Sequence, residues 1–218
     1  MEKYYQTYQE HFNGAPARNL LEIGSRDALH AEILQKLAGV EDSKVFIVEP
    51  HPKSFKDIVR TFPQYRAFEF AISNTPGVIK FNAIPPELFP NHVVGTSSIL
   101  PSNMDFASQN WVGPYPINWI KVLAVNGMTL LELIDEPEID LCKIDVEGFT
   151  WEVLLSFGDA IRAFKSLHIE VEWIQVWKDQ HVYWEVQHLL NFYGFKEMYY
   201  IPLWLGGNQG DSVWMRND

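Results

Sequence analysis

The sequence contains one cysteine, and this scarcity excludes whole classes of protein. Among 218 residues only Cys142 carries a thiol, so the chain forms no internal disulfide. Because Cys142 lies within an apolar run, we expect a buried structural thiol rather than a nucleophile. No apolar run is long enough to span a bilayer, and the amino terminus lacks the apolar core of a signal peptide. We therefore expect a cytoplasmic protein with no membrane partner.

Positive charge is also scarce in this chain. Lysine and arginine total 17 residues against 28 aspartates and glutamates, which gives a formal net charge of −11 at pH 7. This balance argues against nucleic acid as a partner, and it carries no signal for an oligomeric state. The length fits a single α/β domain over residues 1–218, and a hydrophobic content of 47% is sufficient for its core.

The first clear pattern is a strand, a glycine turn, a helix and a second strand that ends in an acid. An apolar run at 19–23 predicts a buried strand that ends at Gly24. A helical pattern follows over 29–37, and a second apolar run at 44–48 ends at Glu49. Such a unit binds the nucleoside part of a cofactor in doubly wound α/β proteins. The apolar face predicted for the helix consists of Leu29, Ile33, Leu34 and Leu37.

The rest of the chain alternates between helical and extended patterns. Residues 1–14 contain an aromatic stripe, Tyr4, Tyr8 and Phe12, which predicts a helix that either packs on the sheet edge or lies over the cofactor. Thr129 and Glu132 have the spacing of a helix-capping box. Further helices are predicted at 52–59, 129–135, 151–164 and 180–193, and further strands at 67–72, 78–83, 120–125, 140–146, 166–173, 195–201 and 212–216.

One long segment, residues 84–119, interrupts this alternation. It is rich in proline, asparagine and serine and shows no sustained periodicity. Loops of this length in a compact domain are usually lids or binding loops. Its aromatic residues indicate that it packs against the rest of the domain or against a ligand, so we expect a lid or substrate loop.

Six short motifs occur in one order along the chain. They are Leu-Glu-Ile-Gly-Ser-Arg-Asp at 21–27, Val-Glu-Pro at 48–50, Ala-Ile-Ser-Asn at 71–74, Gly-Thr-Ser-Ser at 95–98, Met-Thr-Leu at 128–130 and Lys-Ile-Asp-Val-Glu-Gly at 143–148. This series resembles the FkbM family of class I S-adenosylmethionine-dependent methyltransferases. The resemblance covers about residues 19–173 and implies a Rossmann-like, seven-stranded, mostly parallel sheet in the order 3-2-1-4-5-7-6. Helices would cover both faces, with a long loop insertion after strand 3.

The first glycine turn favours one cofactor over another. Family members carry a more glycine-rich loop, whereas Arg26, Asp27 and Ala28 follow Gly24 and Ser25 here. A dinucleotide needs further glycines so that its pyrophosphate can approach the helix start. S-adenosylmethionine has no phosphate, so a loop with one glycine suits it better than NAD.

The cofactor-binding residues follow from these strand ends. Glu49 would accept hydrogen bonds from both ribose hydroxyls, and Gly24 would let the backbone approach the cofactor. Either Asp27 or Glu22 would receive the methionine ammonium. Arg26 would meet the methionine carboxylate or stay on the surface. The resemblance places adenine contacts at Ile72 and Ser73, and the predicted set is completed by Ser25, Pro50, Ser98 and Asp145.

The two strands at 140–146 and 166–173 predict the catalytic side. Asp145 and Glu147 share one face of the first strand, and His168 and Glu170 share one face of the second. Central parallel strands are normally apolar on both faces, so these groups are either paired or functional. Lys143 would neutralise one of the acids. His168 would assist the acids or act as a core histidine.

The predicted reaction is methyl transfer to a hydroxyl group of a sugar or natural product. The acceptor must lose a proton, which a carboxylate or histidine would take. Alternatively, a divalent cation such as Mg²⁺ at Asp145, Glu147 and Glu170 would lower the hydroxyl pKa. Two other readings stay open at this point: a catalytically silent protein that binds S-adenosylmethionine, and an NAD-dependent oxidoreductase.

Overall fold

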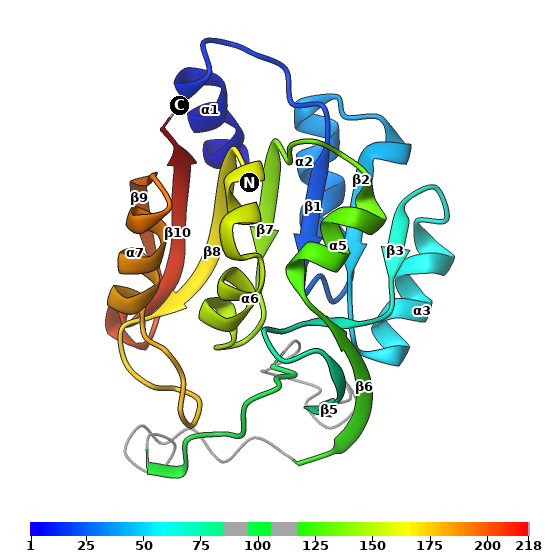
Figure 1. Ribbon diagram of the computed structural model, residues 1–218, viewed down its shortest axis with the longest axis vertical. Helices are drawn as coiled ribbons and strands as arrows, with labels where there is room; N and C mark the ends of the chain where they lie inside the picture. Colours follow the sequence, from blue (N-terminus) through cyan, green and yellow to red (C-terminus); the bar gives the residue numbers. More distant parts are fainter. Residues whose placement is uncertain (85–95, 106–116, 218) are drawn as a thin grey trace.

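The computed structural model describes residues 1–84, 96–105 and 117–217 and has helices on both faces of a central sheet (Figure 1). From one edge to the other, the sheet consists of β3 (Arg66–Phe68), β2 (Val45–Val48), β1 (Leu20–Ile23), β7 (Leu141–Ile144), β8 (Ser166–Glu172), β10 (Gln209–Arg216) and β9 (Phe195–Trp204). Only β10 runs antiparallel, to both of its neighbours. Counted within this sheet alone, the order is 3-2-1-4-5-7-6, as predicted.

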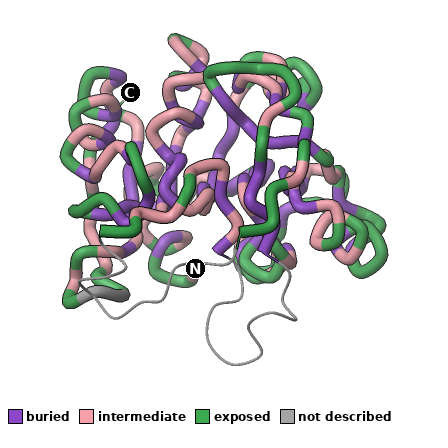
Figure 2. Tube along the Cα trace, turned by 90° about the horizontal axis from the view of Figure 1, so that it is seen from below, coloured by how far each residue is buried: buried purple, intermediate pink, exposed green. Residues whose placement is uncertain are grey.

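Two helical layers enclose this sheet. Helices α1 (Glu2–His11), α2 (Leu29–Ala38) and α3 (Pro52–Thr61) cover one face, and α5 (Gly127–Ile134), α6 (Thr150–Ser156) and α7 (Tyr183–Phe192) cover the other. Short 3-10 helices occupy Asp42–Lys44, Gly158–Ala163 and Leu205–Gly207. Burial is concentrated along the strands, while the outer segments are exposed (Figure 2). None of the described helices has the length and apolarity needed to cross a membrane.

Helix α1 packs against the sheet, over β7 and β8. Tyr4 and Tyr8 are both buried. The Tyr4 hydroxyl accepts a hydrogen bond from the backbone N–H of Cys142 and lies 2.7 Å from Ser166 Oγ. The Cys142 thiol is buried, as predicted.

A second, three-stranded sheet was not predicted. It consists of β4 (Ala71–Ile72), β6 (Trp119–Val125) and β5 (Gly77–Asn82), in that order. The pair β4–β6 is parallel, and β5–β6 is antiparallel. The prediction of one strand at 67–72 is therefore wrong. Strand β2 ends at Val48 opposite Phe68, so residues beyond Phe68 have no partner in the main sheet and pair with β6 instead.

Predicted helix boundaries also differ from the structure, and the helix predicted at 180–193 spans Tyr183–Phe192. The capping box at Thr129 and Glu132 is wrong, because the helix begins earlier and its cap is Asn126, whose side chain accepts a hydrogen bond from the Thr129 backbone N–H at 2.8 Å. The predicted helix at 151–164 ends at Ser156 and continues as a separate 3-10 helix. Gly158 adopts a positive φ of 52° at this break.

Of the apolar face predicted for α2, only Leu34 is buried. Leu29, Ile33 and Leu37 are 49%, 46% and 40% exposed, whereas Ala31 and Leu34 are fully buried. The small side chain of Ala31 lets the helix approach β1, and the larger apolar residues are turned outward. Gly39 follows the last residue of the helix in a left-handed conformation, with a φ of 67°.

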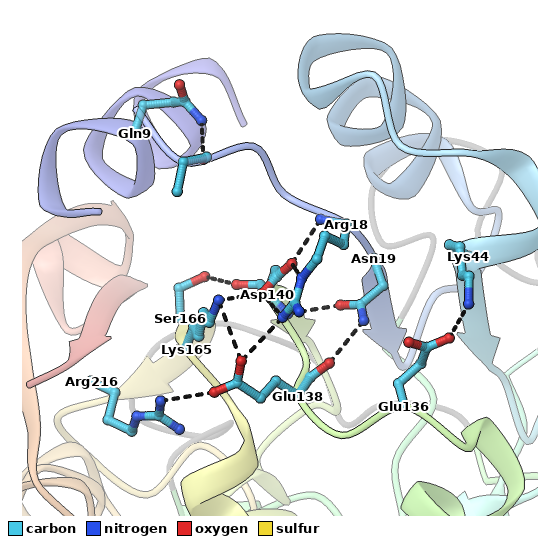
Figure 3. A network of polar contacts seen from close by, with 11 residues as sticks. Gln9, Arg18, Asn19, Lys44, Glu136, Glu138, Asp140, Lys165, Ser166 and Arg216 are labelled. Carbon is cyan, nitrogen blue, oxygen red and sulfur yellow. Dashed lines mark hydrogen bonds and ion pairs between the residues drawn. The ribbon is translucent and has the colours of Figure 1, made fainter. Parts of the chain in front are cut away.

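A polar network closes the end of the sheet where β1, β7 and β8 begin (Figure 3). Asp140 is fully buried and accepts hydrogen bonds from Arg18 Nε at 2.9 Å and from the Arg18 backbone N–H at 2.7 Å. Lys165 Nζ lies 3.0 Å from the same carboxylate. Glu138 adds ion pairs to Arg18, Lys165 and Arg216. This network occupies the amino ends of these strands, so a ligand site on the sheet is expected at their carboxyl ends.

Candidate functional site

A cavity opens at the carboxyl ends of β1, β2 and β7. About 760 Å³ of empty space lies within it, including open solvent at its mouth. Gly24, Glu49 and Asp145, which follow the three strands, form its floor. Residues of the small sheet, together with Ser97 and Ile99, form its wall. The carboxyl edge of an open α/β sheet is where ligands bind in such folds.

Gly24 sits where two strand ends nearly touch. Its backbone N–H donates to Val48 O at 2.9 Å, and the next strand's Asp145 N–H donates to Ile23 O at 2.9 Å. A Cβ atom at residue 24 would lie 1.8 Å from the Asp145 carbonyl oxygen. The φ of 77° also favours glycine. Only glycine fits this position, and its backbone lines the cavity without a side chain.

Glu49 is a buried acid that lines the cavity. Its carboxylate accepts hydrogen bonds from the backbone N–H groups of Arg26 at 2.7 Å and His51 at 2.6 Å. Burial raises the pKa of Glu49 to about 7, although the two backbone donors act in the opposite direction. A carboxylate has about four lone-pair sites, so further donors can still bind to it.

The wall beside Glu49 is apolar. It is formed by side chains from the end of β2, from the small sheet and from the segment that follows it, namely Val48, Ala71, Ile72, Phe81, Ile84 and Ile99. His51 lies at its edge, with its ring centroid 6.4 Å from that of Phe81. The Nδ1 atom of His51 caps α3 by accepting from the Lys53 and Ser54 backbone N–H groups. This slot suits a flat apolar group bound next to a polar one.

Asp145 contributes a carboxylate to the floor of the cavity. Its Oδ2 lies 2.6 Å from Nζ of Lys143, a side chain that is 3% exposed. Burial would raise the pKa of Asp145, but Lys143 lowers it to about 2. Asp145 is therefore a permanent carboxylate at neutral pH.

Glu147 and Glu170 have the opposite electrostatic character. Burial and the negative charge of Asp145 raise the pKa of Glu147 well above its ordinary value. The same two causes raise the pKa of Glu170, which also receives a hydrogen bond from Gln209. Oxygen atoms of Asp145, Glu147 and Glu170 all lie within 4.8 Å of one another. The structure thus brings these three predicted catalytic acids together, although Glu170 lies behind the cavity surface.

Some predicted cofactor residues also line the cavity. Arg26, Pro50 and Ile72 do so, together with Gly24, Glu49 and Asp145. Arg26 pairs with Asp27 at 2.6 Å, and Asp27 also accepts from the Leu29 backbone N–H. Asp27 itself lies outside the lining of the cavity.

Other predicted residues contact the protein itself rather than the cavity. Glu22 is buried and accepts from the Ala31 backbone N–H at 3.0 Å. Ser25 Oγ accepts from the Ala28 N–H at 3.0 Å, and Ser73 Oγ accepts from the Thr75 N–H at 3.0 Å. Ser25 and Ser73 contact the turns that follow their strands, whereas Glu22 contacts the first turn of α2.

His168 and Ser98 also lie away from the cavity lining. His168 is buried, with Nε2 3.0 Å from Asp211 Oδ2 and its ring against Tyr4. Ser98 Oγ donates to the Glu147 carbonyl oxygen at 2.7 Å. Much of the predicted lid lies outside the described residues, but Ile84, Ser97 and Ile99 belong to the cavity wall.

Sequence reasoning missed several cavity residues. His51 and Ser54 follow directly on the predicted acid, so their position after Glu49 was a usable signal. Phe149 likewise follows the predicted motif at 143–148 directly. Phe81 and Ile99 carried no such signal, because they reach the cavity through or beside the unpredicted small sheet.

A family model described as "Methyltransferase FkbM domain" matches residues 22–205 of the chain. Among solved structures, the chain is similar to methyltransferase FkbM from Methylobacillus flagellatus KT, with a TM-score of 0.52 and 10% identity over 91% of this chain and 43% of that one. It is also similar to human methyltransferase 10 domain containing protein, with a TM-score of 0.51 and 8% identity over 98% and 80% of the two chains. At these identities the likeness shows a shared fold, and the chain spans less than half of the first protein. No curated protein sequence matches the chain.

Proposed function

The chain belongs to the FkbM methyltransferase domain family, and we propose that it transfers the methyl group of S-adenosylmethionine to a hydroxyl group of a small molecule such as a sugar or natural product. Family membership confirms the resemblance seen in the motifs and makes the chain an S-adenosylmethionine-dependent methyltransferase. The identity of the acceptor and the use of oxygen as its target atom are the proposed parts.

The observation that carries the proposal is the pairing of a buried acid with an apolar slot in one cavity. Glu49 would hold the ribose hydroxyls, and the slot beside Phe81 and Ile72 would hold the adenine. The bare backbone at Gly24 would let the cofactor approach the floor. These residues fit S-adenosylmethionine, which supplies an electrophilic methyl group on a sulfonium when bound.

We assign different roles to the acidic residues on the cavity floor. Asp145 keeps its negative charge because Lys143 lowers its pKa, so it complements a cationic group in the cavity. Glu147 lines the cavity and has a raised pKa, which makes its carboxylate a stronger base than an ordinary glutamate. We assign to Glu147 the removal of the acceptor's hydroxyl proton, with Glu170 as its neighbour. His168 lies outside the cavity lining, which favours Glu147 over His168 as the base.

The same three acids would alternatively hold a divalent cation. Their oxygen atoms lie within 4.8 Å of one another, and carboxylate oxygens are the ligands that Mg²⁺ prefers. A cation there would lower the pKa of the acceptor hydroxyl and orient it. EDTA inactivation that Mg²⁺ reverses would establish this route, whereas the base route predicts full activity in EDTA.

Calorimetric titration tests the cofactor part of the proposal. We expect S-adenosylmethionine to bind and NADH not to bind. The opposite selectivity would contradict the proposal and support an oxidoreductase.

A labelled methyl donor tests the reaction. Incubation with sugars and hydroxylated natural products should transfer label to oxygen, and Glu147→Gln should lower turnover while leaving cofactor affinity near the wild-type value. Asp145→Asn should weaken both. Cofactor binding with no transfer to any hydroxyl acceptor would contradict the proposal and favour a silent binding protein.

A further inference from the structure

The turn that follows β7 has an unusual backbone. Glu147 has a φ of 49° and Gly148 a φ of 84°, and the hydrogen bond that closes the turn, from Phe149 N–H to Val146 O, is 3.4 Å long. A left-handed conformation is uncommon for a residue with a Cβ atom and persists where the surroundings hold it. The long closing bond contributes little. Other contacts must therefore hold this turn.

Ser98 supplies one such contact from a distant part of the chain. Its hydroxyl donates to the Glu147 carbonyl oxygen at 2.7 Å, across 49 residues of sequence. The same hydroxyl accepts from the Leu100 backbone N–H at 3.0 Å. Ser98 is fully buried, so water does not compete for this bond.

The backbone of Ser98 is itself anchored to the small sheet. Its N–H and carbonyl exchange hydrogen bonds with Asn82, at the end of β5, at 3.3 Å and 2.8 Å. The flanking residues Ser97 and Ile99 line the cavity wall, while Ser98 does not. Ser98 thus joins the wall of the cavity to the turn that carries Glu147.

We propose that Ser98 is a positioning residue that fixes the backbone of Glu147 and so places the Glu147 carboxyl group in the cavity. The inference rests on the proposed role of Glu147 in catalysis. Because Ser98 contacts the carbonyl and not the carboxyl group, it acts through geometry alone. A carboxyl group released from this position would move toward solvent, where its pKa returns toward its ordinary value.

The test compares Ser98→Ala with a matched control, Ser156→Ala. Ser156 Oγ donates to Val153 O at 2.6 Å and accepts from Gly127 N–H at 3.0 Å, so it makes the same pair of bonds away from the cavity. We expect Ser98→Ala to lower kcat by about 10- to 100-fold with KM for the cofactor near wild type. The acid limb of the pH–rate profile should move to lower pH. Ser98→Cys, a weaker donor of similar size, should give an intermediate loss.

A carbon-13 titration of the Glu147 carboxyl group in the wild type and in Ser98→Ala gives a readout that needs no acceptor. We expect its pKa to fall in Ser98→Ala and to stay unchanged in Ser156→Ala. An unchanged Glu147 titration in Ser98→Ala, with a melting temperature lowered as in Ser156→Ala, would overturn the inference. If the titration shifts but no acceptor is methylated, the positioning role stands and the proposed catalytic function fails.

Discussion

The ammonium group of Lys143 and the carboxylate of Asp145 form an ion pair at the floor of the cavity, with Nζ and Oδ2 2.6 Å apart. Burial alone would lower the pKa of Lys143, but Asp145 and Glu22 raise it above its ordinary value. The lysine therefore stays charged inside the protein and keeps Asp145 charged as well.

Replacing the buried lysine should be costly. Lys143→Met leaves the acids without their counter-charge, and we expect the free energy of unfolding to fall by about 3–5 kcal/mol in urea titrations. Lys36→Met, which breaks the exposed pair with Glu32 at 2.6 Å, should change it by less than about 1 kcal/mol. Adding Asp145→Asn to Lys143→Met should restore part of the loss. Equal effects of the two lysine variants would contradict a stabilising role for the buried pair.

Glu49 should control cofactor affinity. Glu49→Gln removes the charge and presents an amide to the backbone donors of Arg26 and His51, so we expect the Kd for S-adenosylmethionine to rise about 10- to 100-fold. Calorimetry measures this directly. Glu69→Gln, an exposed acid that follows β3, is the control and should bind like the wild type. A Glu49→Gln protein with wild-type affinity would exclude Glu49 from the cofactor site.

A comparison of Gly24→Ala with Gly39→Ala separates the steric cost of a Cβ atom from the cost of a left-handed backbone. Gly24 and Gly39 have similar φ values, 77° and 67°, but a Cβ atom meets nothing within 4 Å at Gly39. Gly39→Ala should lower the free energy of unfolding by about 1–2 kcal/mol, through the left-handed backbone alone. Gly24→Ala should lose about 1–3 kcal/mol more, because Asp145 must move. Cofactor affinity should fall only in Gly24→Ala, and its retention there would argue against a close approach at this turn.

Stability should depend on pH in an unusual direction. Burial raises the pKa values of Glu22, Glu49 and Glu172 from 4.5 to about 7, so the folded protein binds more protons than the unfolded chain between these values. The melting temperature should therefore fall as pH rises from 4.5 to 7. The lowered pKa of Asp145 has the opposite effect. The stability that the Asp145 carboxylate contributes is lost as pH falls from 3.8 to about 2.

Glu22→Gln tests that pH dependence at one position. Gln keeps an acceptor for the Ala31 N–H but does not titrate, so the fall in melting temperature between pH 4.5 and 7 should become smaller than in the wild type. Glu132→Gln, at an exposed position of α5, should leave the profile unchanged. A wild-type protein that is more stable at pH 7 than at pH 5 would refute the assignment.

The floor of the cavity could be predicted from the sequence, because its residues are marked by local patterns. Gly24 and Glu49 each follow an apolar run, and Asp145 ends another, so the strand ends are visible without knowledge of pairing. Strand order came from the family resemblance rather than from these runs. The structure then placed all three residues at one edge.

The wall of the cavity could not be predicted in the same way. Phe81 and Ile99 reach it through pairing with segments far along the chain, and a single sequence does not show register. The pattern at 67–72, interrupted only by Glu69, was interpreted as one strand, since composition does not show where a neighbouring strand ends. The helix predicted at 29–37 is present, but its buried face was predicted wrongly, because Ala31 packs toward the sheet and three of the larger apolar residues do not.

The division of the molecule into two sheets has a consequence for how such a protein changes over evolutionary time. Glu49 and Gly24 follow strands of the main sheet, whereas much of the apolar wall comes from a separate sheet with its own ladder of hydrogen bonds. Insertions or replacements in the small sheet leave every ladder of the main sheet intact. Related chains can thus differ in the wall of the cavity and still share the strand ends that carry Gly24 and Glu49.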